Sequence, residues 1–290
     1  MDTIVIMVRI TKRKVGKYEY YYLVRSFRKK GRICKEQKYL GKEVPDNVRE
    51  LMEQFKKKGL SEFYEKLERI KKNFQLEWNS LPKSVKDIEK EKIAVAFTYN
   101  TNAIEGSTIT LEEAKEIIED KISPNKPLRD VKETESHAKV FLEMLDKKEK
   151  LSEQLILRWH KEIFGETKPD IAGKYRDYLV RVGDHLGSDW QDIPWLIKKL
   201  FVFLKTKGMN PVELSARVHY RFEKIHPFGD GNGRIGRLMI NYILWLNRYP
   251  MLVIEYKKRR SYYKALKRDE EGFVNYLLRR YIAVHEKMLK

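Results

Sequence analysis

The chain has 290 residues, of which 42% are hydrophobic and 12% aromatic, a composition that excludes a disordered or collagen-like protein. It carries 61 Lys and Arg against 42 Asp and Glu, and the net charge of +19 favours anionic partners such as nucleotides, nucleic acid or acidic lipid. A charged fraction of 36% is also typical of thermophile surfaces, so composition alone does not choose between these interpretations.

Cysteine content and hydropathy narrow the class of protein further. Cys34 is the single cysteine, which excludes an internal disulfide and a multi-cysteine zinc site. No apolar run approaches the length of about 18 residues that a membrane span needs, and the first residues lack the cleavage site of a secretory signal. The sequence therefore predicts a cytoplasmic protein with no membrane partner.

The first 45 residues differ from the rest of the chain. They hold 13 Lys and Arg against four Asp and Glu, a net charge of +9. Three short stretches rich in β-branched and aromatic residues, separated by the turn sequences KVGK and RKKG, predict a small basic β-meander. We expect either a solvated or homodimer-forming sheet, or a nucleic-acid contact. The candidate stacking residues for that contact are Tyr18, Tyr20, Tyr21, Tyr22 and Phe27.

Beyond Pro45 the apolar residues recur with helical spacing. We expect a helical connector over residues 46–90 and a mainly α catalytic domain over residues 91–290. The segment 173–190 alternates around two glycines and predicts a small β-hairpin within that domain. Thr110 with Glu113 forms a capping box, and Asn210 with Pro211 opens a helix that ends near Ile225.

The stretch HPFGDGNGRIGR at residues 226–237 contains the candidate catalytic residues. His226 stands at the tip of a helix, and three closely spaced glycines let backbone N–H groups gather before the next helix, which adds its own N-terminal dipole. Arg234 and Arg237 share a face of that helix, so the segment predicts a cup for phosphates. Asp230 is suited to Mg²⁺ and His226 to proton transfer near neutral pH, which together predict phosphoryl or nucleotidyl transfer.

This stretch resembles the signature of Fic-domain proteins, H-P-F-x-D/E-G-N-G-R-x-x-R, at every fixed position. The flanking segments HYRFEKIHPF, GKYR and RRSYYKAL are similar to the family as well, and the resemblance covers roughly residues 90–285. It implies a compact helical fold with a β-hairpin flap. It also implies transfer of AMP from ATP to a Ser, Thr or Tyr hydroxyl of a target protein, or of the chain itself.

A second segment, Thr101 to Gly106, resembles the family's inhibitory motif S/T-x-x-x-E-G/N, here on a helix near residues 91–105. The resemblance implies that Glu105 pairs with Arg237 and takes this arginine from the γ-phosphate of ATP. A carboxylate within a cationic cup is a phosphate mimic, which is consistent with that role. Two alternatives stay open: removal of AMP by the same site, and a nucleic-acid-binding regulator that uses residues 1–45.

The resulting assignments cover catalysis, metal binding, nucleotide binding and inhibition. His226 is the catalytic base and Asp230 the Mg²⁺ ligand, with ATP as the substrate. The nucleotide-binding residues are Phe228, Gly231, Asn232, Gly233, Arg234, Arg237, Tyr262 and Tyr263, and the inhibitory residues are Thr101, Glu105 and Gly106.

Overall fold

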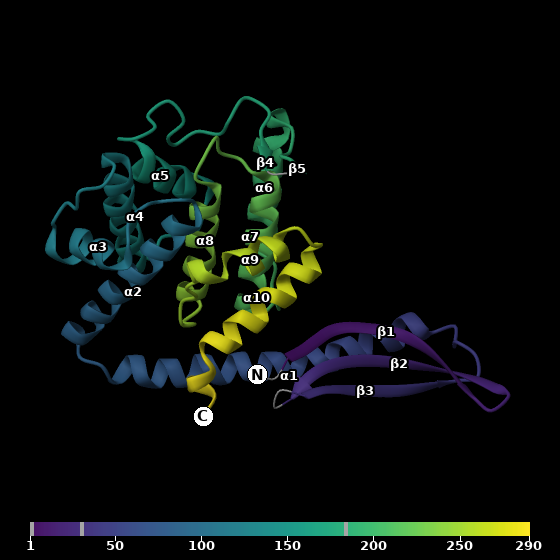
Figure 1. Ribbon diagram of the computed structural model, residues 1–290. Helices are drawn as coiled ribbons and strands as arrows, with labels where there is room; N and C mark the ends of the chain where they lie inside the picture. Colours follow the sequence, from purple (N-terminus) through teal and green to yellow (C-terminus); the bar gives the residue numbers. More distant parts are fainter. Residues whose placement is uncertain (1–2, 30–31, 183–184) are drawn as a thin grey trace. The chain divides into compact units, whose positions relative to one another are not determined.

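The computed structural model describes the backbone of residues 3–29, 32–182 and 185–290 (Figure 1). Side chains are described for the same ranges except residues 3–7, 26–29, 32–34, 56–60, 182 and 185–186. The chain forms two compact units, one from residues 1–73 with 277–290 and one from residues 74–276. These limits differ from the expected boundaries at residues 45 and 90, and which segments fold independently remains a prediction.

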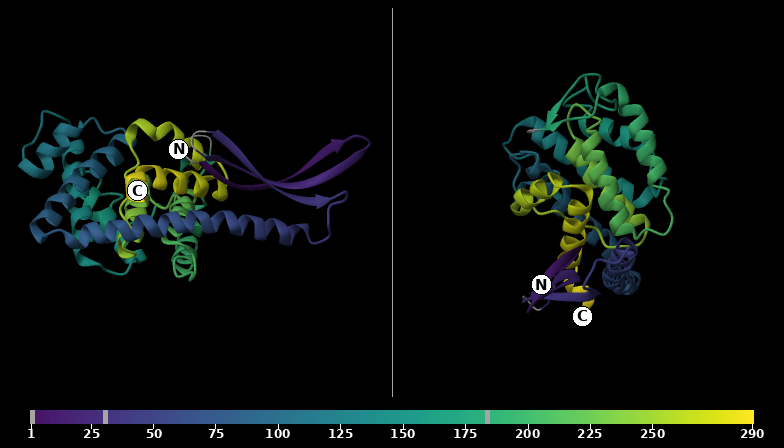
Figure 2. Two further views of the ribbon diagram at one scale, coloured as in Figure 1. Left: turned by 90° about the horizontal axis from the view of Figure 1, so that it is seen from below. Right: turned by 90° about the vertical axis from the view of Figure 1, so that its right-hand side faces the viewer.

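The first unit contains the basic meander. Its strands are β1 (Thr3–Val15), β2 (Tyr18–Lys29) and β3 (Arg32–Gly41), which pair antiparallel in the order β1-β2-β3 and twist along their length (Figure 2). The predicted three-stranded sheet is therefore confirmed. Helix α1 (Val48–Ser80) follows as one continuous helix. One face of the sheet is buried on the first part of α1, where Arg25 lies over the Phe55 ring and 3.3 Å from Glu62.

The second unit is almost entirely helical. Its helices are α2 (Lys83–Ile104), α3 (Leu111–Lys115) with a π-turn over Glu116–Asp120, α4 (Leu128–Lys147), α5 (Glu153–Phe164), α6 (Ile193–Phe203), α7 (Pro211–Ile225), α8 (Asn232–Leu246), α9 (Arg259–Leu266) and α10 (Glu270–Val284), the last of which extends beyond this unit. Short 3₁₀ turns cover Trp190–Asp192, Tyr256–Lys258 and Glu286–Leu289. The expected hairpin consists of β4 (Arg181–Val182) and β5 (His185–Leu186). Among the described residues, no helix is both long and apolar enough to cross a membrane.

Local chemistry sets the ends of these helices as the sequence predicts. Asn210 caps α7 by accepting a hydrogen bond from the N–H of Val212 at 2.9 Å. The capping box of Thr110 and Glu113 is formed at the start of α3. Gly106 follows α2 with φ of 94°, the left-handed conformation that glycine adopts most easily. These caps fix where α7 and α3 begin and where α2 ends.

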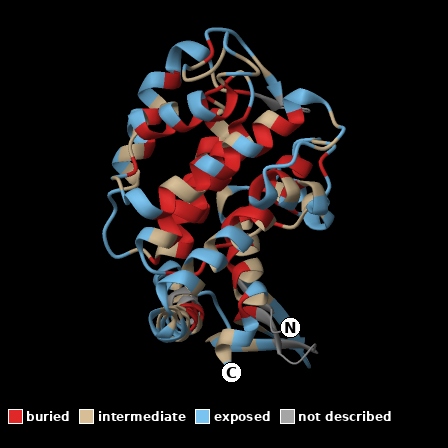
Figure 3. Ribbon diagram, turned by 90° about the vertical axis from the view of Figure 1, so that its left-hand side faces the viewer, coloured by how far each residue is buried: buried red, intermediate tan, exposed pale blue. Residues whose placement is uncertain are grey.

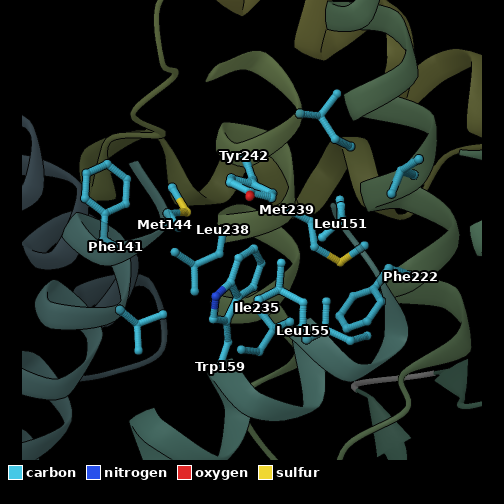
Figure 4. Close-up of a cluster of buried hydrophobic side chains, with 14 of the residues drawn as sticks. Phe141, Met144, Leu151, Leu155, Trp159, Phe222, Ile235, Leu238, Met239 and Tyr242 are labelled. Carbon is cyan, nitrogen blue, oxygen red and sulfur yellow. The ribbon is translucent and has the colours of Figure 1, made fainter. Parts of the chain in front are cut away.

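The core of the second unit lies around α8, whose residues are buried over most of its length (Figure 3). Figure 4 shows Trp159 of α5 against Leu238 and Tyr242 of α8, and the rings of Trp159 and Tyr242 meet edge to face at 5.3 Å. Burial of such large rings stabilises a fold strongly. The packing anchors the end of α7 and the start of α8, and so positions the loop between them.

Candidate active site

The signature loop, residues 226–231, joins α7 to α8. His226 caps α7 in a left-handed conformation, with φ of 52° and ψ of 61°. A non-glycine residue in this region is uncommon and is held there by its surroundings. The imidazole is half-buried, and this burial lowers its pKa. His226 is therefore suited to accept a proton at neutral pH.

Arg176 holds this conformation in place. Its buried guanidinium donates to the carbonyl of His226 at 2.8 Å, of Tyr178 at 2.6 Å and of Ser188 at 2.6 Å. Its own backbone N–H donates to the carbonyl of Pro227 at 3.0 Å. One side chain thus connects the signature loop to both sides of the β4–β5 hairpin.

Asn232 closes the loop from inside. Its amide oxygen accepts from the N–H of Phe228 and its amide nitrogen donates to the carbonyl of Phe228, both at 2.8 Å. Gly231 adopts φ of 78°, and a Cβ there would lie 2.4 Å from the Phe164 ring. Both ends of the Asn232 amide are therefore used within the loop, and glycine is required at position 231 by sterics as well as by conformation.

His160 supports the loop from α5. Its Nδ1 accepts from the N–H of Gly173 at 2.9 Å, which leaves Nε2 to donate to the carbonyl of Asp230 at 3.0 Å. Its ring stacks on the buried Phe228 ring, with centroids 3.9 Å apart. Burial lowers the pKa of His160 to about 4, so the ring is neutral. These contacts give His160 a structural role in holding the loop.

Asp230 and Arg234 belong to one network of charges. The buried Glu133 of α4 pairs with Arg234 and accepts from the Lys168 ammonium at 2.7 Å. Lys168 also lies 2.8 Å from Oδ2 of Asp230. Burial alone would raise the pKa of Glu133, but Arg234 and Lys168 outweigh it and hold the pKa below its usual value. Both carboxylates are therefore ionised at neutral pH.

The guanidinium of Arg237 is bound by both Thr101 and Glu105. It is 2% exposed, and its Nη2 donates to Oε1 of Glu105 at 2.7 Å. Its Nε donates to the hydroxyl of Thr101 at 2.6 Å, and its Nη2 to the carbonyl of Thr101 at 3.1 Å. A Cβ at Gly233 would lie 2.2 Å from Oε1 of Glu105, so this glycine makes room for the ion pair. The expected contact between Glu105 and Arg237 is present.

The two tyrosines of α9 lie in different environments. Tyr262 is 1% exposed, and its hydroxyl is 2.7 Å from Nε2 of His219 and 3.5 Å from Nη1 of Arg237. Burial holds the pKa of Tyr262 well above its usual value, so the phenol is neutral. Tyr263 is 40% exposed and donates to the carbonyl of Ile104 at 3.3 Å. The Tyr263 ring is therefore partly open to solvent at the site, whereas the buried Tyr262 contacts Arg237 from within the core.

The structure brings together residues that no local sequence pattern connects. Glu133, Lys168, Arg176 and Glu223 all belong to the site or its support, and sequence reasoning did not select them. Glu223 has a buried carboxyl oxygen without a hydrogen-bond partner among the described atoms, and burial raises its pKa to about 7. Arg176 alone had a signal, because it ends the GKYR segment that resembles the start of the flap.

Comparison with known proteins identifies the fold. Residues 150–244 match the Fic/DOC family. A protein adenylyltransferase Fic from Nematostella vectensis is 31% identical over 222 residues, which are 73% of this chain and 51% of that protein. Another from Drosophila ananassae is 32% identical over 203 residues, 66% of this chain and 40% of that protein. The chain thus spans about half the length, or less, of these curated relatives.

Two solved structures share the arrangement of helices. A Fic-domain-containing signaling protein from Bacteroides thetaiotaomicron superimposes with a TM-score of 0.66 at 26% identity, over 78% of this chain and 96% of that one. Fic-1 from C. elegans also reaches 0.66, at 24% identity, over 86% and 78% of the two chains. The Fic domain that the signature at residues 226–237 predicted is confirmed: this chain contains a domain of the Fic/DOC family.

Proposed function

We propose that the chain is a protein adenylyltransferase, which transfers AMP from ATP to a hydroxyl side chain of a protein. The observation that carries this proposal is the signature loop, where a half-buried neutral His226 stands beside a glycine-lined helix start with two arginines. The names of the curated relatives, protein adenylyltransferase Fic, support the same reaction. Self-modification is the simplest form of the reaction to test, because the target protein is unknown.

The reaction assigns a separate step to each group. His226 takes the proton from the acceptor hydroxyl, whose oxygen forms a bond to the α-phosphorus of ATP. The bond between the α-phosphorus and the bridging oxygen breaks, and pyrophosphate leaves with that electron pair. The N–H groups of Asn232 and Gly233 open α8 and would stabilise the developing negative charge, and the N–H of Gly231, which donates to Oδ1 of Asp230 at 2.6 Å, would join them when released from that bond. Asn232 assists by fixing the loop through Phe228.

The residues at Asp230 fit a Mg²⁺ ion. The Asp230 side chain is 48% exposed, and its carboxylate is kept ionised against burial by Lys168 and Arg234. Mg²⁺ is commonly bound through one or two carboxylates together with substrate phosphates, and this donor set matches that pattern. When bound, the ion neutralises phosphate charge. Lys168 adds positive charge next to Asp230, 2.8 Å from its Oδ2.

We further propose that Glu105 inhibits the transfer. A fully exposed ion pair is worth under about 1 kcal/mol and could not hold such a switch. Arg237 is buried, whereas the Glu105 side chain is 28% exposed, so the pair is shielded mainly on the arginine side. Thr101 and Tyr262 hold Arg237 independently of Glu105. Loss of the Glu105 carboxylate would therefore leave Arg237 in place and open to the γ-phosphate.

The test is incorporation of label from α-labelled ATP into the full chain. We expect little incorporation by the wild type and at least a tenfold increase for Glu105→Gly, which corresponds to about 1.4 kcal/mol of relieved inhibition. Arg237→Ala should not reproduce this gain, because it removes the phosphate contact together with the inhibitory one. Adding His226→Ala to Glu105→Gly should abolish incorporation while leaving ATP binding largely intact.

Three outcomes would contradict parts of the proposal. Equal incorporation by the wild type and Glu105→Gly would show that Glu105 does not inhibit. Undiminished transfer by the double variant with His226→Ala would exclude His226 as the base. Release of AMP from pre-modified protein, without any incorporation by either form, would favour AMP removal by the same site.

A further inference from the structure

The two faces of the N-terminal sheet carry different residues. The pairing of Ile10 with Leu23 and of Lys12 with Tyr21 places these side chains on the face that packs on α1. Residues between them along each strand point to the opposite face. We call that opposite surface the tyrosine face. Its described members are Arg9, Thr11, Arg13 and Val15 of β1, Tyr18, Tyr20, Tyr22 and the buried Val24 of β2, and Lys35, Gln37 and Tyr39 of β3.

Aromatic rings are grouped on the tyrosine face near the turn between β1 and β2. The Tyr39 ring lies 6.1 Å from that of Tyr20 and 5.3 Å from that of Tyr22. Tyr18 is 59% exposed and Tyr39 is 55% exposed. Buried rings stabilise a fold, so rings that are left exposed do not serve the stability of the sheet. Where several exposed rings form one patch, that patch usually marks a surface that binds a partner.

The rings are interleaved with cations. The Arg13 guanidinium lies 5.1 Å from the centre of the Tyr22 ring, and the Lys42 ammonium lies 4.5 Å from that of Tyr18. None of the described members of the tyrosine face is acidic.

The carboxylates of the sheet lie on the other face. There Glu19 pairs with Lys12 at 2.5 Å, and Glu36 pairs with Arg25. The alternation of the strands thus separates paired charges on one face from positive charge on the other.

We propose that the tyrosine face binds single-stranded nucleic acid. Exposed rings on a basic sheet provide stacking surfaces for bases while the cations contact phosphates. A duplex fits less well, because its bases are stacked on one another and leave no ring face for the tyrosines. An anionic lipid surface or an acidic peptide would use the cations and leave the rings without a role.

The experiment measures binding of the full chain to a fluorescent 15-nucleotide oligothymidylate by anisotropy at several salt concentrations. The charge variant is Arg9→Gln with Arg13→Gln. Its matched control is Lys12→Gln with Lys14→Gln, which removes the same charge from the same strand on the opposite face. The ring variant is Tyr18→Ser with Tyr39→Ser, and its control is Tyr21→Ser.

We expect the ring variant to weaken binding about fivefold or more for each ring, whereas Tyr21→Ser should have little effect. The charge variant should reduce the slope of log Kd against log salt by about one for each arginine, and the lysine control by clearly less. AMP transfer should be unchanged in all of these variants, so a failure here leaves the proposed function intact.

Several results would overturn the proposal. Equal losses in the charge variant and its control would mean that binding depends on the charge of the whole module and not on one face. Preference for a duplex of the same length would exclude stacking as the basis of recognition. Binding to vesicles of phosphatidylserine without any binding to the oligonucleotide would assign the face to a membrane instead.

Discussion

The signature loop and the tyrosine face use the same residue types in opposite ways. At the loop, Arg234 and Arg237 are buried, and each is paired with a carboxylate from a distant part of the chain. On the sheet, Arg9 and Arg13 are exposed on a face whose described residues include no acid. A buried, paired charge is held in one position, as a catalytic site requires. An exposed charge attracts a flexible partner at long range but does not fix the position in which that partner binds.

This difference predicts which substitutions will strongly reduce stability or activity and which will not. Charges that are taken out of water depend on their partners, because removing one partner leaves the other buried and unpaired. Exposed pairs lose little, because water replaces the lost partner. The predictions below follow from this contrast, from the largest expected effect to the smallest.

Glu133→Gln should be the most destabilising single change of the site. Glu133 neutralises Arg234 and Lys168, and its side chain is only 7% exposed. Loss of the carboxylate should lower the free energy of unfolding by about 3–5 kcal/mol, measured by urea denaturation. The control is Lys12→Gln, which breaks the exposed pair with Glu19 and should cause no measurable change. Similar losses in both variants would show that burial does not distinguish the two regions.

Sequence reasoning succeeded where the information is local. The helix caps at Thr110 and Asn210, the three strands and the order of parts in HPFGDGNGRIGR depend on neighbours within a few residues. Glu133 and Lys168 could not be found in this way, because they reach the loop from sites 101 and 62 residues away from Arg234 and Asp230. A single charged residue on a helix or loop has no sequence pattern from which a partner far away in the chain could be predicted.

The sheet shows the same limit in another form. Tyr18, Tyr20, Tyr21 and Tyr22 are equivalent in composition, but the register with β1 separates Tyr21 from the other three. Sequence alone predicts the alternation of faces and not which face is covered. The contribution of Phe27, whose side chain lies outside the described residues, stays a prediction.

Arg176→Gln should disable transfer without disabling ATP binding. The variant removes the bonds to the carbonyls of His226, Tyr178 and Ser188 and lets the base move relative to the α-phosphate. A misplacement of about 1 Å can cost about 10²-fold in rate. In a Glu105→Gly background we expect kcat to fall by about that factor, with little change in the KM for ATP.

Arg176→Lys should restore little of that activity, because an ammonium cannot serve three carbonyls with the geometry of a guanidinium. Circular dichroism of each variant controls for loss of the fold. A rise in KM with kcat preserved would show that Arg176 acts in nucleotide binding and does not position His226.

The smallest effect concerns pH and the carboxyl group of Glu223. Burial raises the pKa of this group to about 7 in the folded chain, against 4.5 as its ordinary value, although Arg237 opposes the shift. Below about pH 4.5 the group is protonated in both states, and its contribution to stability is fully present. As pH rises from 4.5 to 7 the folded state holds more protons than the unfolded state, so the free energy of unfolding falls. The total loss is at most about 3 kcal/mol.

Glu223→Gln keeps the shape of the side chain and removes this titration. Urea denaturation of the wild type and the variant between pH 5 and 8 should give a difference in stability that grows with pH and levels off above about 7. His160, whose pKa burial lowers to about 4, titrates in the opposite sense, but it is common to both proteins and cancels in the difference. Parallel stability curves would show that the Glu223 carboxyl is ionised at little cost. The contrast between a site that depends on buried, matched charges and a sheet that does not would then fail at a buried carboxyl group that interacts electrostatically with Arg237.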